Sequence, residues 1–249
     1  MPRYFLEVSY KGTNYSGFQV QENANSIQAE VQKAFSIYFR EQIEMTGSSR
    51  TDTGVHALQN FFHFDFPLKI PDQALYNINS ILPRDIVALK LHPVHPRAHC
   101  RFDAGSREYK YYVYRDKDPF LNDRAFYYPY PLDMEKLQAA AEIITGFTDF
   151  SSFSKRNSQV KNFLCTIYQS NWSLENNCLA YQVQANRFLR GMVRGLVGTM
   201  LQVGRGKISL AQFESIIQNR DAGQADFSVP GHGLFLARVN YANEIFNPS

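Results

Sequence analysis

Residues 47–66 of the chain read GSSRTDTGVHALQNFFHFDF. The first part, residues 47–59, combines an arginine, a carboxylate, a histidine and several small or hydroxyl-bearing side chains. The remainder is an apolar, aromatic run typical of a buried strand. A dense polar segment that leads directly into such a strand predicts a functional loop on a rigid sheet. Arg50 and Asp52 are two positions apart, so on an extended backbone their side chains point to the same face.

Two interpretations of Arg50 and Asp52 follow from this spacing. A close arginine keeps a carboxylate ionised and restricts its rotamers, which are the properties a nucleophilic aspartate needs. The same spacing fits a surface turn with an ordinary ion pair, because structural ion pairs are common. The pattern alone leaves both interpretations open.

Length and composition indicate a globular protein. The 249 residues can form one large domain or two smaller ones, and 44% hydrophobic with 20% charged residues is typical of a folded chain. There is no apolar run of 18 residues, and the N-terminal residues resemble a strand rather than a signal peptide. The three cysteines are widely spaced and fit buried thiols in a reducing compartment. We therefore expect a cytoplasmic protein without a membrane segment.

The charge distribution is more informative than the net charge. A net charge of +3 gives no global argument for nucleic-acid binding, but residues 187–209 contain five basic side chains and no acidic one. The 15 tyrosines and 20 phenylalanines supply core material and faces on which bases can stack. The six histidines are too scattered to argue for zinc, and no glycine-rich phosphate loop is present. These observations give no argument for a metal or a cofactor.

Hydrophobic periodicity predicts the same order of elements in both halves of the chain. In the first half, strands are expected at 5–10, 43–46, 59–66 and 85–91, with helices at 26–39 (capped by Asn25) and 71–82. A proline-rich connector, 93–97, follows. In the second half, strands are expected at 107–115, 162–174, 179–185 and 234–241, with a hairpin turn at 175–177 and helices at 132–145, 188–203 and 209–219.

Each half therefore reads β-α-β-β-α-β, the ferredoxin-like order that RRM-like domains share. We predict an α+β chain of two such half-domains, 1–104 and 105–249, with antiparallel sheets joined around a central cleft. The first half-domain carries the Asp52 loop.

The expected helix 188–203 has three distinct stripes. Apolar pairs four residues apart form a face toward the core. A second face carries Arg187, Arg190 and Arg194, and a third carries Gly191, Gly195 and Gly198. Each glycine inside a helix costs about 1 kcal/mol relative to alanine, so close approach of another backbone or of a nucleic acid strand is expected to require them. The alternative is a solvated basic face, with the glycines packed on a neighbouring element.

Residues 49–57, SRTDTGVHA, closely resemble the G-R-T-D-A-G-V-H-A signature of the tRNA pseudouridine synthase A family. Other segments resemble that family in the same order, from Tyr10 to about Val239: Tyr10-x-Gly12 with 15–19, then 79–86, 98–102, 107–111, 188–194 and 233–234. The chain departs from the family pattern at five positions: Phe18, Val20, Ser49, Thr53 and Cys100. Cys100 interrupts the usual H-A-R-F run, and Val20 replaces a basic residue.

The resemblance implies that a homodimer isomerises uridine to pseudouridine in the anticodon stem-loop of tRNA, around positions 38 to 40, without cofactor or metal. Asp52 is the implied essential carboxylate, acting either as a nucleophile on the nucleoside or as the base that takes a ribose proton. The implied substrate-binding residues are Tyr109, which stacks on the target base, and Arg50 and Arg194. The expected phosphate contacts are Arg107, Lys110, Arg187, Arg190, Arg205 and Lys207.

Two other classes of protein remain as alternatives. A non-catalytic RNA-binding protein on the same fold would bind RNA equally well after Asp52→Ala. A metal-independent hydrolase that uses Asp52 on an N-glycosidic bond would release free uracil. Arg50, Asp52, Tyr109 and Arg194 together argue against the non-catalytic alternative.

Overall fold

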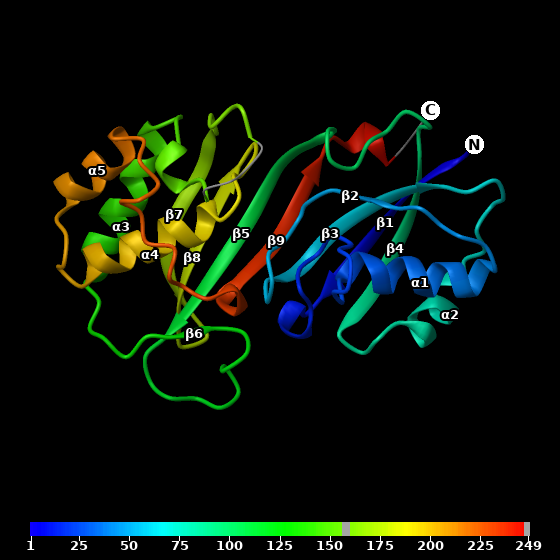
Figure 1. The fold of residues 1–249 in the computed structure, drawn as a ribbon, viewed down its shortest axis with the longest axis horizontal. Helices are drawn as coiled ribbons and strands as arrows, with labels where there is room; N and C mark the ends of the chain where they lie inside the picture. Colours follow the sequence, from blue (N-terminus) through cyan, green and yellow to red (C-terminus); the bar gives the residue numbers. More distant parts are fainter. Residues whose placement is uncertain (156–159, 247–249) are drawn as a thin grey trace. The chain divides into compact units, whose positions relative to one another are not determined.

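The computed structural model describes residues 1–155 and 160–246 (Figure 1). The chain forms two compact units, which we call unit 1 (1–105 together with residues from 236 onward) and unit 2 (106–235). Each unit contains helices and strands. The pairings of β1 with β3 and β4, of β2 with β3, and of β8 with β5 and β7 are antiparallel, and that of β5 with β6 is parallel. The predicted α+β class is therefore confirmed. Within the described residues, no helix is long and apolar enough to cross a membrane.

Unit 1 contains a sheet with two helices. Its elements are β1 (Arg3–Tyr10), α1 (Ile27–Phe39), β2 (Thr46–Gly47), β3 (His56–Asp65), α2 (Ala74–Ile81) and β4 (Ile86–Val94). The strand order is β4-β1-β3, and β3 also pairs with β2 and with β9 (Leu234–Tyr241), which enters unit 1 at residue 236. The sequence order in this unit is thus β-α-β-β-α-β.

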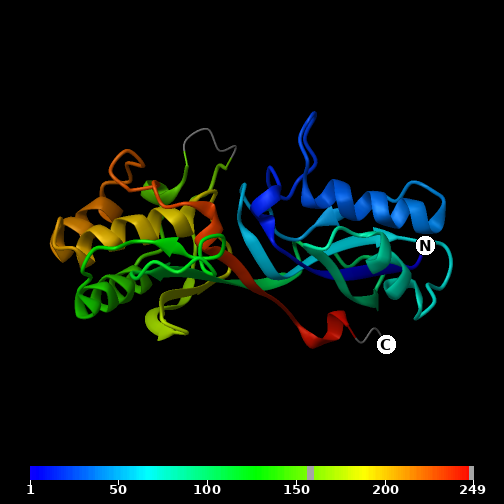
Figure 2. The ribbon, with the colours of Figure 1, turned by 90° about the horizontal axis from the view of Figure 1, so that it is seen from below.

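Helix α1 covers one face of the β1–β3 pair. The strands are in register with Tyr4 opposite Phe64, and the Phe35 ring of α1 packs against the Phe64 ring at 5.4 Å between centroids. Phe39 of α1 packs on Phe66 at 4.3 Å. Figure 2 shows α1 on one side of the unit 1 strands.

The C-terminal segment covers the other face of the same pair. Here Tyr241 and Phe246 pack on Phe5 and Phe61, with ring centroids 5.1–6.2 Å apart. Because β3 is buried on both faces, its aromatic run is nearly continuous instead of alternating with polar residues. Burial lowers the pKa of the His63 imidazole on this face to about 4, so the ring is neutral at pH 7.

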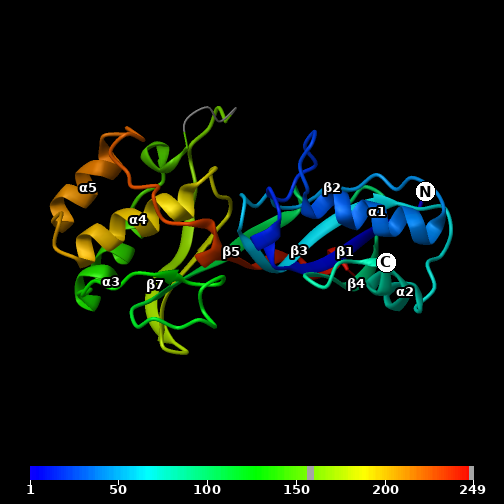
Figure 3. The same ribbon diagram turned by 60° about the horizontal axis from the view of Figure 1, so that its bottom comes forward.

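Unit 2 contains three antiparallel strands and three helices. Its elements are β5 (Ala104–Tyr114), β6 (Phe126–Tyr127), α3 (Met134–Ile143), β7 (Ile167–Glu175), β8 (Cys178–Ala185), α4 (Met192–Gly204) and α5 (Leu210–Gln218). The strand order is β5-β8-β7, and the short β6 is parallel to β5. Figure 3 shows α3, α4 and α5 grouped together in this unit. Short 3-10 turns lie at 12–14 and 243–245 in unit 1 and at 144–146, 151–153 and 231–233 in unit 2.

Several sequence predictions match these elements. Asn176 and Asn177 both have positive φ, 50° and 63°, which is the two-residue hairpin turn that asparagine tolerates. Ser209 and Gln212 form the expected capping box of α5. β9 spans the predicted 234–241.

Other boundaries were wrong by a few residues. Ser26, and not Asn25, caps α1 by accepting a hydrogen bond from the Ala29 amide at 3.3 Å. β3 begins at His56, β2 covers only 46–47, and β7 begins at Ile167 rather than 162. Residues 93–94 belong to β4 instead of a connector, because they pair with Arg3 and Tyr4 of β1. The short strand β6 was not predicted.

The largest correction concerns the start of α4. The helix begins at Met192, because Gly191 adopts φ +75°, a left-handed conformation that interrupts a right-handed helix. Arg187 and Arg190 therefore precede the helix. The prediction that they share a helical face with Arg194 was wrong.

The glycines of α4 lie against another segment of unit 2. A Cβ atom on Gly195 would lie 2.8 Å from the Phe227 ring, and one on Gly198 would collide with the Asp226 carbonyl oxygen. Gly198 thus shows the expected close approach of another backbone, and both glycines pack on a neighbouring element, as the alternative also predicted. That backbone belongs to the segment 226–229 of the same unit.

We predict that Gly198→Ala lowers the free energy of unfolding by about 1–3 kcal/mol, the usual cost of overpacking a core. Helix propensity alone predicts a gain of about 1 kcal/mol, so the sign of the change separates the two effects. Urea denaturation measures it. The control is Gly146→Ala, because nothing lies within 4 Å of the added Cβ there. Unchanged or increased stability of Gly198→Ala would contradict the packing argument.

Candidate active site

Asp52 occupies the first position of a tight turn between β2 and β3. The Val55 amide donates to the Asp52 carbonyl oxygen at 3.2 Å, and Gly54 at the third position has φ +77°. A positive φ at this position is the requirement of a type II turn, which explains the glycine. The Asp52 residue is half-buried, while Thr53 at the tip is exposed.

Buried hydrogen bonds from β1 and β3 fix the loop on both sides of Arg50. The hydroxyls of Tyr10 and Thr51 lie 2.8 Å apart. The Asn60 side-chain amide donates to the Ser49 carbonyl oxygen at 2.9 Å and to the Tyr10 hydroxyl at 3.2 Å. A satisfied polar network in a low-dielectric interior is rigid, so the backbone that carries Arg50 and Asp52 is held in place.

The loop 12–18 supports the same turn from another side. The Phe18 amide donates to the Thr51 carbonyl oxygen at 3.0 Å, and the Gly12 amide donates to Nδ1 of His56 at 3.0 Å. A Cβ atom on Gly12 would collide with the Val55 carbonyl oxygen, which explains why glycine is needed there. Tyr15 anchors the loop by donating to the Asp85 carboxylate at 2.6 Å.

Sequence reasoning missed the supporting roles of Tyr10, Asn60 and His56. Tyr10 and His56 fall within motifs that were noticed, but Asn60 was interpreted only as part of a strand. Its signal was present: Asn60 is a polar residue inside an otherwise apolar run and is fully buried in the structure. A buried amide must find hydrogen-bond partners, and here the donor group binds the Ser49 carbonyl oxygen of the loop and the Tyr10 hydroxyl.

Arg50 is exposed, in contrast to its neighbours in the loop. Within the described residues its guanidinium forms no ion pair and no hydrogen bond. It can therefore bind an external anion, such as a phosphate, without breaking an internal contact.

Tyr109 and Arg194 both belong to unit 2. Tyr109 lies on β5 opposite Val183 and is 9% exposed, and its ring packs edge to face on Phe188 with 5.0 Å between centroids. Arg194, in the first turn of α4, donates from Nε to the Val229 carbonyl oxygen at 2.8 Å. Each side chain is thus held by contacts within its own unit.

The six expected phosphate-binding residues are all in unit 2, but their surroundings differ. Lys110 pairs with Glu175 at 2.9 Å and lowers the pKa of that carboxylate. The Arg205 guanidinium lies 3.6 Å from the centroid of the Tyr130 ring. Arg107 donates to the Asn186 carbonyl oxygen at 3.1 Å, and Arg187 is half-buried. Arg190 and Lys207 are the exposed members of the set.

Comparison with known proteins gives a consistent result. A family model described as tRNA pseudouridine synthase matches residues 7–103 and 140–242, which is most of the chain. Three relatives named tRNA pseudouridine synthase A illustrate the similarity. The protein of Parabacteroides distasonis is 42% identical and the match covers 99% of this chain and 98% of the relative. That of Bacteroides fragilis is 43% identical (98% of each), and that of Bacillus licheniformis 40% identical (95% and 98%).

The family match includes the turn that carries Asp52, its support from Tyr10 and Asn60, and the α4 segment with Arg194. The chain therefore belongs to the tRNA pseudouridine synthase family.

Proposed function

We propose that this enzyme isomerises uridine to pseudouridine at positions 38–40 of the tRNA anticodon stem-loop, with Asp52 as the essential carboxylate and without a cofactor. Family membership supports the coarser statement that the chain is an isomerase acting on uridine in tRNA. The observation that carries the finer proposal is the fixation of the Asp52 turn by the buried Tyr10, Asn60 and Thr51 side chains. A reacting group needs such a preorganised position.

The reaction exchanges one bond for another. The glycosidic bond between N1 of the base and C1′ of the ribose breaks, the base rotates, and a bond from C5 to C1′ forms. The proton on C5 is lost and N1 gains one, so no electrons enter or leave. Asp52 either attacks the nucleoside or takes a ribose proton, and both routes need an ionised carboxylate.

The target uridine must leave its stack before Asp52 can reach it, which costs a few kcal/mol. We assign Tyr109 to stacking on this base and to the transfer of the C5 proton. We assign Arg50 and Arg194 to binding the same nucleotide, and Arg194 to keeping Asp52 ionised. These three assignments rest on the family pattern in the sequence.

Contacts to the RNA backbone would repay the cost of extruding the base. Arg190 and Lys207 are the first candidates because they are exposed. Lys110 and Arg205 would have to exchange contacts with Glu175 and Tyr130 for contacts with phosphate. We also propose that both units have the ferredoxin-like arrangement and that the enzyme works as a cytoplasmic homodimer, as the family resemblance implies.

Asp52→Ala should reduce the reaction by a factor on the order of 10⁴ or more, because the essential carboxylate is lost. The assay uses an anticodon stem-loop with tritium at uridine C5 and follows tritium release, free base and strand integrity. Tritium release by the unmodified enzyme, without free uracil or strand cleavage, supports the synthase. Free uracil would instead indicate a hydrolase.

The Asp52→Ala variant should keep the circular dichroism spectrum and the thermal stability of the parent, because Asp52 lies at a half-exposed turn. Activity retained in this variant would overturn the assignment of Asp52. Thr53→Ala, at the exposed tip of the same turn, is the matched control and should retain activity within a few-fold.

Tyr10→Phe should lower kcat about three- to tenfold, with little change in KM for RNA. The variant loses one or two buried hydrogen bonds, each worth about 0.5–1.5 kcal/mol, and loosens the Asp52 turn without touching the RNA. Steady-state kinetics on the stem-loop separates the change in kcat from the change in KM. Tyr76→Phe is the control, because Tyr76 is 69% exposed on α2. A change confined to KM would contradict the positioning role.

Lys207→Ala and Arg190→Ala should each weaken RNA binding and reduce the magnitude of the slope of log K against log salt by about 0.7–0.9, the loss of one phosphate contact. Filter binding at several salt concentrations measures the slope. Lys69→Ala removes an equally exposed lysine in unit 1 and should leave the slope unchanged. If none of the variants alters the slope, these two residues do not bind phosphate.

A further inference from the structure

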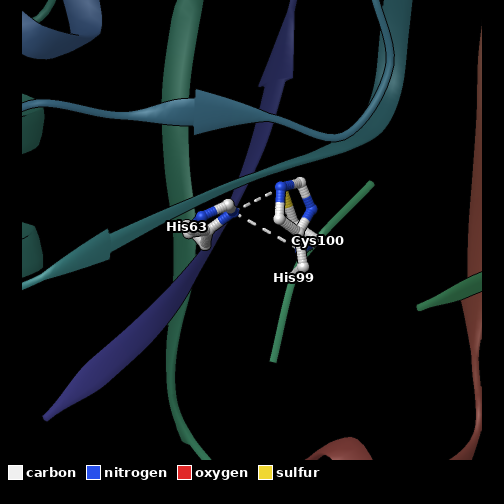
Figure 4. A group of neighbouring side chains, drawn as sticks. All are labelled: His63, His99 and Cys100. Atoms are coloured by element: carbon white, nitrogen blue, oxygen red, sulfur yellow. Dashed lines mark hydrogen bonds between the residues drawn. The ribbon is translucent and has the colours of Figure 1, made fainter. Parts of the chain in front are cut away.

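A cluster of His63, His99 and Cys100 lies in unit 1, outside the turn that carries Asp52 (Figure 4). His63 comes from β3, while His99 and Cys100 come from the turn that follows β4. One donor atom from each residue lies within 4.8 Å of the others. The reaction proposed above uses none of these three side chains.

The distance between His63 and Cys100 suits a shared metal ion. Nδ1 of His63 lies 3.2 Å from Sγ of Cys100. Tetrahedral bonds of about 2.0 Å to nitrogen and about 2.3 Å to sulfur separate two zinc ligands by about 3.5 Å. These two side chains therefore need to move by only a few tenths of an ångström to bind one ion. The ion would replace the Cys100 amide, which donates to the same Nδ1 atom at 3.4 Å.

His99 supplies the third donor atom, and its exposed side is where a metal ion can reach the cluster from the solvent. Its ring lies 4.5 Å from the His63 ring between centroids, and it is half-exposed, whereas His63 and Cys100 are buried. A tetrahedral ion would need a fourth ligand besides these three donors, and a water molecule could supply it.

Two hydrogen bonds orient the cluster residues in the metal-free protein. The Cys100 thiol donates to the Thr46 carbonyl oxygen of β2 at 3.1 Å, and the His99 amide donates to the Asp103 carboxylate at 2.8 Å. Two cations, Arg3 and Arg101, lie near His99, and Arg3 is paired with Asp65 at 2.7 Å. The Asp103 carboxylate adds negative charge beside the cluster.

We propose that His63, His99 and Cys100 bind one Zn²⁺ ion in unit 1, with a water molecule as the fourth ligand. Two imidazoles and a thiolate are ligands that zinc favours over magnesium or calcium. When the ion binds, the Cys100 thiol loses its proton to the solvent and gives up its hydrogen bond to the Thr46 carbonyl oxygen. The ion would join β3 to the 98–103 turn. Tyr241 connects this site to the loop, because its hydroxyl contacts both the Cys100 carbonyl oxygen and the Ser48 hydroxyl.

The test uses the full-length protein, stripped with a chelator and dialysed, and then titrated with Zn²⁺ against a chromophoric competitor. We expect one equivalent to bind with a Kd below about 10 µM. Cys100→Ser keeps the size and the hydrogen bond to Thr46 but replaces the soft ligand, and it should weaken binding about 100-fold or more. Cys165→Ser, at an equally buried cysteine of unit 2, should bind as the parent does.

Co²⁺ provides a second readout that does not depend on activity. The parent and Cys165→Ser should show sulfur-to-cobalt charge-transfer absorption in the near ultraviolet, and Cys100→Ser should not. Zn²⁺ should raise the Tm of the parent and leave that of Cys100→Ser unchanged. If Cys100→Ser fails to fold, the variant His99→Gln is used in its place. This substitution changes the half-exposed ligand and should weaken zinc binding at least about tenfold. A parent Kd above about 10 µM, or binding that these ligand substitutions leave unchanged, would overturn the site.

Discussion

The antiparallel pairing of β1 with β3 is the constraint on which unit 1 depends. It places Tyr10 at the end of one strand and Asn60 within the other, where their side chains meet and reach the loop before β3. Aromatic layers on both faces of the pair exclude water from this junction. The position of Asp52 is therefore set by buried strands rather than by the exposed turn itself.

The same strands connect the Asp52 turn with the cluster proposed to bind a metal ion. Asn60 of β3 supports the Asp52 turn on one side, and His63, three residues later, belongs to the cluster with His99 and Cys100. The Tyr241 hydroxyl contacts both Ser48 at the start of the loop and Cys100. An ion in the cluster would thus add a rigid connection at the base of the loop, without taking part in the isomerisation.

Unit 2 obtains rigidity by close backbone packing. Gly195 and Gly198 allow the segment 226–229 to lie directly against α4, and two of its carbonyl oxygens, those of Phe227 and Val229, accept hydrogen bonds from the Arg194 guanidinium. The glycines and the arginine therefore act together, because the approach of this segment is what places its carbonyl groups beside Arg194. Larger residues at these helix positions would displace the segment and with it the orientation of the guanidinium.

The sequence alone determined the α+β class, most strands and helices, and the family, because periodicity and a dense motif are local properties of the chain. It also predicted Asp52 as the essential carboxylate. It did not determine where α4 begins, because the left-handed backbone of Gly191 is a conformational choice made by packing. It also missed Asn60 as a support of the loop and the meeting of His63 with His99 and Cys100. Those contacts join residues far apart in the chain, and only strand register and burial bring them within bonding distance.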